Sequence, residues 1–580
     1  MVDYLISQRD ERAERAEQVA AVRETYGYNM EMGFPVAAGT TEDDGPALRW
    51  QIKSLEAQER LRMNLRVLKR RGKWNFVNDL QPLAPIKLAS MIRADDMAGI
   101  VDYFMPVPGG IVGDVREKSL QDFRDVFALS QPPSIVERFR SDEYFAECFV
   151  AGPDPTRLKR MTAIPGKFPI TSEHLTALPE FATDDLDTAI AAGRVYWVDY
   201  EAMLELDDGV HPQAQKYMYS PMVAFCVPRR GGALRPFAIQ TGQDPAGREV
   251  YTPADGHSWS LAKNCVLAAH NTYHEVLTHL GFTHLMSEPV LLAAVRNFAA
   301  NHPVCVLLRR HFEGTFSINK LAVELLIQPG KAVEYLIGSD LKSTYPWLAK
   351  HRANHSFRDN YLPTKLASSG TDGQQRLPHF PYRDDGLLVW NAISAWVTDF
   401  VSAYYRDDND VRADHELQAW AAEVATAGQV RDFGATPGRI GDLHDLVEIL
   451  TMVIWTAGPQ HAAVNFAQKD HMAFLPANPL AGYTPEPKGK GHTEADWLAN
   501  LPPLDVAVQQ FCVMTFLGSI HHTVLGDYED DFRGGPASGA HQRFLTHLTS
   551  VEDEIKARNR RRTMPYEYLQ PSLIPNSTNI

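Results

Sequence analysis

The sequence predicts a mainly α-helical fold with one small antiparallel β subdomain. Long helical patterns fill most of the chain after Trp259, whereas β-branched and aromatic runs are concentrated between 195 and 239. Hydrophobic residues make up 44% of the 580 residues and charged residues 22%. This composition is ordinary for a folded globular protein and differs from that of a disordered chain. The length exceeds that of an average domain, but a large helical enzyme can form one body of this size.

The N-terminal region is predicted to be a helical extension, residues 1–74, preceding a large domain, residues 75–580. Charged, alanine-rich sequence predicts a helix over 10–25, and after a Gly/Thr/Asp linker a second helix is expected over 48–71. The second helix ends in the basic residues Lys69–Arg71. A solvated face on a packing helix is the preferred interpretation, and peripheral contact with an anionic membrane is the alternative.

In the rest of the chain, residues typical of turns separate the predicted strands and helices. Proline and glycine interrupt short apolar runs over 75–113, so loops are expected there. The runs at 195–198 and 222–227 predict strands of a small antiparallel sheet. Long helices are predicted at Trp259–Phe298, Leu388–Tyr405, Asp414–Ala427, Asp442–Phe466, Leu504–Leu525 and His541–Arg561.

Charge and cysteine pattern narrow the function classes. The net charge of −15 disfavours a nucleic-acid partner, because affinity for phosphates depends on Lys and Arg. The five cysteines occur singly with no Cys-x-x-Cys, which argues against a disulfide framework and a thiolate metal cluster. No apolar run reaches the roughly 18 residues that a membrane span requires. We therefore expect a cytoplasmic protein, at most membrane-peripheral.

Three histidines at five-residue intervals, His274, His279 and His284, mark the candidate functional site. Residues five apart on a regular α-helix are displaced by roughly 140° and cannot share one small ion. A π-turn brings them onto one face, so a metal site here predicts a widened turn between His279 and His284. The zinc-protease motif His-Glu-x-x-His is not met, because His279 comes one position too late. Hydrogen-bonded core histidines are the alternative without a metal.

A second candidate pair, His461 and Asn465, has the spacing of four that places both side chains on one face of an α-helix. Taken alone, a core or capping pair is the simpler interpretation. Imidazoles with an oxygen donor and no thiolate suit iron, zinc or copper, and ligand type does not choose among these metals.

Several motifs together resemble the lipoxygenase family from about residue 75 to the end of the chain. They are Trp259-x-x-Ala262-Lys263, the histidines at 274, 279 and 284, Leu307-Leu308-x-x-His311, Ile318-Asn319-x-Leu321-Ala322, the pair at 461 and 465, and Pro575-Asn576-Ser577 with Ile580. The helical segment 1–71 is too short and wrongly patterned for the N-terminal β-sandwich of plant and animal members. The resemblance is therefore to the compact bacterial-type form, with a large helical catalytic domain whose long central helices carry the metal ligands.

The resemblance implies one non-haem iron held by His279, His284 and His461, with Asn465 as a weak ligand and the main-chain carboxylate of Ile580 as another. An iron-bound hydroxide would take a hydrogen atom from a bis-allylic carbon of a polyunsaturated fatty acid of the linoleate or arachidonate type. Dioxygen would then add to give a hydroperoxide, so the metal supplies the redox chemistry.

The resemblance also assigns supporting residues. His274 is expected beside the ligands, and Glu275 and Gln468 are expected to form a hydrogen-bonding pair that links the two ligand helices near the substrate. The residues expected to line the substrate channel are Ala322, Leu326 and Val333. In the family an alanine at the position of Ala322 favours an S product, whereas a glycine there favours an R product.

Two rival functions share this fold. One is an iron-dependent isomerase of fatty-acid hydroperoxides, which the sequence separates poorly from a dioxygenase. The other is a catalytically silent lipid-binding protein, which should have lost a ligand, whereas all five candidate ligand positions are filled. A zinc hydrolase lacks its helix spacing. We expect a monomer.

Overall fold

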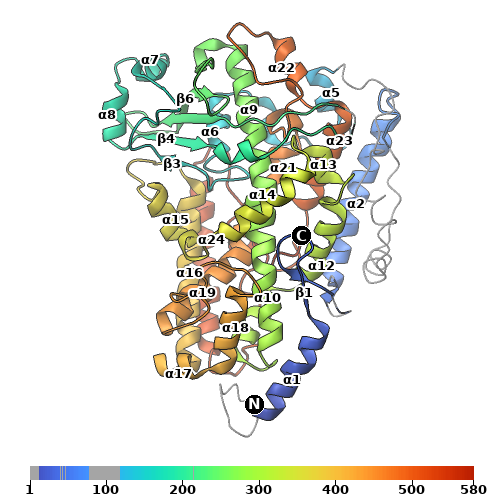
Figure 1. The fold of residues 1–580 in the computed structure, drawn as a ribbon, viewed down its shortest axis with the longest axis vertical. Coiled ribbons are helices and arrows are strands. Elements are labelled where there is room, and N and C mark those ends of the chain that lie inside the picture. The colour runs from blue at the N-terminus through green and yellow to red at the C-terminus, as the bar shows by residue number, and fades with distance from the viewer. Residues whose placement is uncertain (1–11, 40, 42–43, 46, 78–117, 213) are drawn as a thin grey trace.

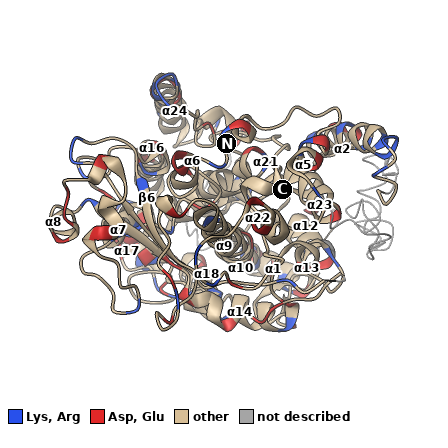
Figure 2. Ribbon diagram, turned by 90° about the horizontal axis from the view of Figure 1, so that it is seen from above, with Lys and Arg blue, Asp and Glu red and all other residues tan. Residues whose placement is uncertain are grey.

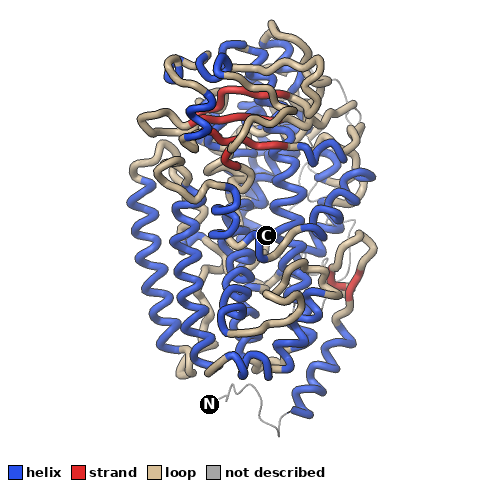
Figure 3. Tube along the Cα trace, turned by 60° about the vertical axis from the view of Figure 1, so that its left-hand side comes forward, coloured by secondary structure: helices blue, strands red, loops and turns tan. Residues whose placement is uncertain are grey.

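Long helices form an elongated body that carries a small β-sheet at one end (Figures 1 and 3). This computed structural model describes residues 12–39, 41, 44–45, 47–77, 118–212 and 214–580. The mainly helical fold with a small antiparallel sheet is therefore confirmed. Most of the predicted loop region, residues 78–113, lies outside the described residues. In the described part of the chain, no helix is long and apolar enough to cross a bilayer.

The N-terminal region lies along one flank of the body (Figure 1). Helices α1 (Arg12–Thr25) and α2 (Leu48–Lys69) confirm the two predicted helices. Between them, β1 (Tyr28–Asn29) pairs antiparallel with β2 (Val36–Ala37). The region is attached to the main body, because α1 and β2 contact α10 and α2 contacts α23, two helices whose bounds follow.

One stripe of α2 is buried against the body. Its apolar members, Trp50, Ala57, Leu61, Leu65 and Leu68, recur at helical spacing. Each large side chain of this kind stabilises the fold by roughly 1.5–3 kcal/mol when fully buried. The interpretation of α2 as a packing helix is therefore confirmed for this face.

The small sheet has four antiparallel strands in the order β3-β4-β5-β6. The sequence predicts β4 and the residues of β5, and every residue of β5 is buried. Both faces of the sheet are covered, since one packs against α7 and α8 and the other against the main helical core. The elements are β3 (Lys159–Arg160), α7 (Ser172–Thr176), α8 (Leu186–Ala191), β4 (Val195–Asp199), β5 (Met222–Cys226) and β6 (Arg235–Gln240).

Two helical rods, each made of two α-helices joined by a π-helix, position the functional site. The first comprises α9 (His257–Tyr273), a π-helix (His274–His284) and α10 (Leu285–Asn297), which follow one another without a break through the centre of the molecule (Figure 1). Its sequence is apolar on nearly all sides, which is why it is buried. The second comprises α19 (Leu443–Trp455), a π-helix (Thr456–Gln460) and α20 (His461–Asn465), and α20 contacts the first π-helix.

Further helices complete the body. They are α5 (Leu120–Asp125), α6 (Asp142–Glu147), α11 (Pro303–Leu308), α12 (Thr315–Leu321), a third π-helix (Ala322–Leu326), α13 (Ala332–Leu336), α14 (Leu341–Asn354), α15 (Leu362–Ser369), α16 (Pro381–Tyr404), α17 (Asp408–Ala413), α18 (His415–Ala425), α21 (Ala467–Met472), α22 (Glu494–Asn500), α23 (Leu504–Leu517) and α24 (Ser538–Asn559).

Two predicted boundaries are wrong. The sequence predicts a helix that begins at Leu388, but α16 begins at Pro381. The sequence predicts a helix to Leu525, but α23 ends at Leu517. Beyond Gly518 the chain bonds to the C-terminal segment, since Leu525 N donates to Ile574 O at 2.7 Å. A side chain at Gly518 would also clash, because its Cβ would lie 2.5 Å from Lys469 Cβ.

Candidate metal centre

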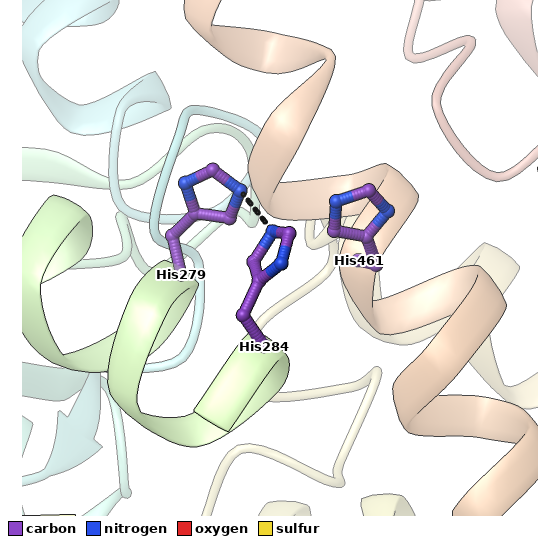
Figure 4. Close-up of side chains that lie close together, drawn as sticks. All are labelled: His279, His284 and His461. Atoms are coloured by element: carbon purple, nitrogen blue, oxygen red, sulfur yellow. Dashed lines mark hydrogen bonds between the residues drawn. The ribbon is translucent and has the colours of Figure 1, made fainter. Parts of the chain in front are cut away.

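Three histidines from the two rods converge at one buried point. His279 and His284 come from the first π-helix and His461 begins α20 (Figure 4). One ring nitrogen of each lies within 4.8 Å of the others, and all three side chains are buried. The structure therefore brings together the three imidazoles that the sequence predicts as ligands, and the widened turn predicted between His279 and His284 is confirmed.

Neighbouring side chains fix the protons of two of these rings. The Nδ1–H of His284 donates to Asn319 Oδ1 at 2.8 Å. His279 Nδ1 lies 3.4 Å from Glu275 Oε2. Burial would raise the pKa of Glu275, but the charge and hydrogen bonds of His274 and His279 outweigh it and lower the pKa to about 2. Because a carboxylate only accepts, the proton of His279 also belongs on Nδ1.

The remaining nitrogens are arranged for a cation. The Nε2 atoms of His279 and His284 face each other at 3.2 Å (Figure 4), and with both protons on Nδ1 each atom presents a lone pair. Burial lowers the pKa of all three histidines, to about 3 for His284, and they are neutral as metal binding requires. Opposed lone pairs in a buried site repel unless a cation lies beside both. The residues present therefore fit a metal ion.

The chain end supplies an oxygen to the same point. Ile580 is buried, and its main-chain oxygen lies 3.3 Å from His461 Nε2. The C-terminus therefore lies in the centre of the molecule (Figure 1). Asn465 is one turn beyond His461, where its Nδ2 donates to Leu517 O at 2.9 Å and its Oδ1 accepts from Gln468 Nε2 at 3.2 Å. Its ligand role stays a prediction.

Side chains of other residues hold the chain end in place. His311 Nδ1 lies 2.9 Å from Asn576 O, and Ser577 Oγ donates to Glu313 O at 2.7 Å. The hydroxyls of Thr315 and Thr578 are 3.0 Å apart. These contacts tie the last residues to the segment around α12, which explains how an apolar terminus is kept buried.

The predicted supporting residues surround His279. His274 is outside the ligand cluster, with its Nε2 2.9 Å from Val464 O. Gln468 Nε2 lies 3.3 Å from the same His279 Nδ1 that Glu275 approaches. Among the hydrogen bonds of the described residues, none joins Glu275 directly to Gln468. With the proton of His279 on Nδ1, that nitrogen and Gln468 Nε2 are both donors, so Gln468 lies beside the ring without a hydrogen bond to it. The role of Glu275 and Gln468 in linking the two rods stays a prediction.

Each π-helical segment of the described chain lies at this site. One carries His279 and His284, the π-helix at 322–326 begins at Ala322, and the π-helix at 456–460 ends directly before His461. Such widened turns occur mostly at functional positions, where they redirect side chains. The segments at 322–326 and 456–460 were not expected from the sequence.

An apolar cavity of about 90 Å³ opens beside the metal cluster. Its walls include His279, His284 and Ile580, and all three predicted channel residues, Ala322, Leu326 and Val333. Leu280, Phe516 and Trp50 also line it. The cavity is therefore placed where an apolar substrate would meet the metal.

Sequence reasoning missed Trp50, Asn319 and Leu280. Asn319 was recognised only as part of a motif, without a role. Trp50 belongs to the buried stripe of α2, and its distance along the chain hides that it reaches the cavity. The helical periodicity of α2 was the available signal for its burial, but it does not say what the helix covers.

The fold and the histidine cluster together define a mainly helical metalloenzyme. Residues 115–567 match the Lipoxygenase family. The chain is 40% identical over 482 residues to the Linoleate 9/13-lipoxygenase of Pseudomonas aeruginosa, covering 80% of this chain and 70% of the relative. It is 30% identical over 473 residues to the Hydroperoxide isomerase ALOXE3 of Rattus norvegicus, covering 80% of this chain and 66% of that protein.

Solved structures agree with these matches. A LOX crystallised anaerobically in complex with arachidonate superimposes with a TM-score of 0.84 at 28% identity, covering 99% of this chain and 82% of that chain. A structure named Manganese Lipoxygenase shares the fold, with a TM-score of 0.78 at 23% identity and full coverage of both chains. The chain belongs to the lipoxygenase family, and it is an oxidoreductase with a catalytic metal.

Proposed function

We propose that this lipoxygenase is a non-haem iron dioxygenase that converts polyunsaturated fatty acids of the linoleate or arachidonate type to hydroperoxides. The observation that carries the proposal is the meeting of three neutral imidazoles with the wall of an apolar cavity. The bacterial relative is named for linoleate and a structural neighbour binds arachidonate, which supports this substrate class.

The proposed iron ligands are His279, His284, His461, Asn465 and the carboxylate of Ile580. Nitrogen and oxygen donors without thiolate suit iron, and the same donors suit manganese, which a neighbouring structure is named for. Iron bound there supplies the one-electron and oxygen chemistry that the side chains lack. Metal analysis of the purified protein tests this assignment, and manganese as the stoichiometric metal would contradict it.

The cavity residues have a positioning role in this proposal. Leu280, Ala322, Leu326 and Val333 surround an alkyl chain with apolar surface beside the histidine cluster. Such walls exclude water and hold the bis-allylic carbon near the metal, while contributing no acid or base.

Ala322 is proposed to set the stereochemistry as S, because its methyl group narrows one side of the cavity. Ala322→Gly removes this methyl and should shift the product toward R, measured by chiral chromatography of the hydroperoxides. Ala332→Gly, a change of the same size on α13 outside the residues that line this cavity, is the matched control. An unchanged chiral profile in Ala322→Gly would remove the stereochemical assignment.

We also propose that α2 covers the substrate cavity. Trp50 is buried and lines the cavity, which supports this role. Lys and Arg recur along α2 (Figure 2), and Leu48, Ile52 and Met63 are exposed on the same helix. A basic surface with exposed apolar side chains is suited to peripheral contact with an anionic membrane. Retention of substrate affinity and vesicle binding after deletion of residues 1–71 would count against both roles.

A hydroperoxide isomerase is the second candidate, because one relative carries that name. Oxygen uptake with linoleate or arachidonate distinguishes the two functions. A dioxygenase consumes oxygen in proportion to the fatty acid, whereas an isomerase converts an added hydroperoxide without oxygen uptake.

We propose the domain organisation that the sequence predicts, with a helical extension over 1–74 and a catalytic domain over 75–580. We also propose that the protein is a cytoplasmic monomer. The five cysteines are free thiols, which supports a reducing compartment. Light scattering of the purified protein tests the monomer.

A further inference from the structure

A second cavity, of about 330 Å³, lies against another face of the metal-ligand π-helix. Thr278, Phe282 and Thr283 form part of its wall, whereas Glu275, His279, Leu280 and His284 border the cavity at the metal. The two cavities share no lining residue. The second cavity is therefore a separate space, and the proposed dioxygenase function assigns it no role.

Two cations face this cavity, and one buried carboxylate, Asp154, lies near them. Arg157 and Lys365 line it, and no ion pair to either occurs among the described residues. Arg157 packs over the ring of Tyr273, with its guanidinium carbon 3.8 Å from the ring centre, and NH1 donates to the Tyr273 hydroxyl at 2.9 Å. Burial and the nearby charge of Arg157 lower the pKa of Lys365 to about 8, so the two cations are close.

The nearby carboxylates do not complete this charge. Asp359 is the single carboxylate among the described lining residues, and it is exposed. Asp154 is buried near Arg157; burial opposes its ionisation, but the charges of His270 and Arg157 outweigh burial and lower its pKa, so it is an anion that compensates one of the two cations. Its Oδ1 accepts from Thr156 and its Oδ2 from Thr278 at 2.7 Å, so neither oxygen is in contact with Lys365. Like charges in a partly buried space raise the free energy of the fold unless an anion compensates them.

Unused donors point to the same missing group. Arg157 Nε is buried without a hydrogen-bond partner in the described structure. Thr456 is 4% exposed and lines the cavity, and its hydroxyl likewise has no partner there. A buried polar group left unpaired costs roughly 1–3 kcal/mol. An anion with several lone pairs would satisfy both donors and the remaining positive charge.

We propose that this cavity binds a small oxyanion, a phosphate or carboxylate group, between Arg157, Lys365 and Thr456. The cavity volume is at the lower end of the roughly 300–1,000 Å³ of ligand pockets, which suits a small head group. The bound group would contact the turn that carries His279 and His284, since Phe282 lies in the wall and stacks on His355 at 4.1 Å.

Calorimetric titration of the metal-loaded, full-length protein with inorganic phosphate and with acetate tests the site. At least one of the two probes should show a single saturable site. Lys365→Met should weaken binding at least tenfold, and Thr456→Val several-fold. Lys488→Met, which removes an exposed lysine outside the cavity, should bind as the wild type does.

A stability measurement separates binding from folding. Thr456→Val removes an unpaired buried hydroxyl, so the ligand-free variant should be at least as stable as the wild type, while anion-induced stabilisation should shrink. Two results would overturn the proposal: no saturable binding of either anion up to 10 mM, or equal affinity in Lys365→Met and wild type.

Competition distinguishes a free anion from a lipid head group. Glycerol 3-phosphate should displace the bound probe if the occupant is a free anion, and vesicles containing phosphatidate should displace it if the occupant is a head group. Displacement of the probe by either ligand in the wild type, with no such displacement in Lys365→Met, supports the oxyanion site. Failure of both to displace the probe would contradict it.

Discussion

At the scale of single residues, Asn319 decides which nitrogen of His284 is available to the metal. Its Oδ1 accepts the Nδ1 proton, and its Nδ2 donates to His284 O at 3.1 Å and to Glu288 Oε2 at 2.8 Å. The amide is thus held by two acceptors of its own, so it presents a fixed acceptor to the ring. Partners of this kind orient a ligand and make it more basic.

Asn319→Ala should lower metal affinity about 10- to 100-fold, because His284 loses the acceptor that fixes its tautomer. Competitive metal titration measures this change, with circular dichroism to show that the variant folds. Asn354→Ala, on the outer end of α14, is the control. Wild-type affinity in Asn319→Ala would show that the hydrogen bond has no influence on the metal.

The sequence predicts the histidine cluster better than its surroundings. His279, His284 and His461 were predicted because imidazole is a specific ligand and the motifs resembled a known family. Asn319 could not be assigned a role, because its partner is 35 positions away and its amide chemistry is common to many buried asparagines. Hydrogen-bond partners are fixed by tertiary packing, which no local pattern encodes.

At the scale of elements, α2 links stability to substrate access. Trp50→Ala opens the wall of the metal cavity, so we expect a KM for the fatty acid at least threefold lower, together with a loss of roughly 3–5 kcal/mol in unfolding free energy. Leu68→Ala, buried on the same helix but outside the cavity lining, is the matched control for destabilisation. An equal change of KM in both variants would assign the effect to general loosening.

Glu288 on α10 makes the attachment of the N-terminal hairpin depend on pH. It accepts from Ala37 N at 2.7 Å, and burial raises its pKa to about 7 despite that bond. The folded protein therefore holds a proton that the unfolded chain releases near pH 4.5. The stability that this proton contributes to the folded state is fully present below pH 4.5 and is lost as the pH rises through 7. The shift corresponds to roughly 3 kcal/mol.

Glu288→Gln should accordingly flatten the decline of the melting temperature between pH 5.5 and 8, measured by calorimetry. Glu567→Gln, at an exposed position, should keep the wild-type decline. If Glu288→Gln declines as steeply as the wild type, another group causes the pH dependence.

The sequence predicts the long helices better than the π-helices within them and the residues at which helices end. The long apolar stretch beginning at Trp259 predicts a buried helix, and His279 and His284 predict the widened turn within it through their spacing. The π-helices at 322–326 and 456–460 carry no such pair of ligands, and a change from i→i+4 to i→i+5 hydrogen bonding leaves no pattern in composition. The end of α23 was missed because contacts with the C-terminal segment determine it.

At the scale of the whole molecule, the chain end is folded into the centre of the protein, against residues from α12 and α20. Extending the chain by Gly-Ser after Ile580 should reduce bound metal at least tenfold, because the terminal carboxylate would be displaced from His461. Metal content by elemental analysis measures this. The same two residues added at the N-terminus are the control, and a fully metallated extended protein would exclude Ile580 as a ligand.

The volume of the metal cavity has a consequence for apparent affinity. At about 90 Å³ it is smaller than the roughly 300 Å³ at which ligand pockets begin, so a whole fatty acid requires the cavity walls to move apart. If the wider conformation is only partly populated without substrate, the observed dissociation constant is the intrinsic one divided by the fraction of protein in that conformation. If that fraction were about 1%, the whole protein would bind its substrate about 100-fold more weakly than the wider conformation does.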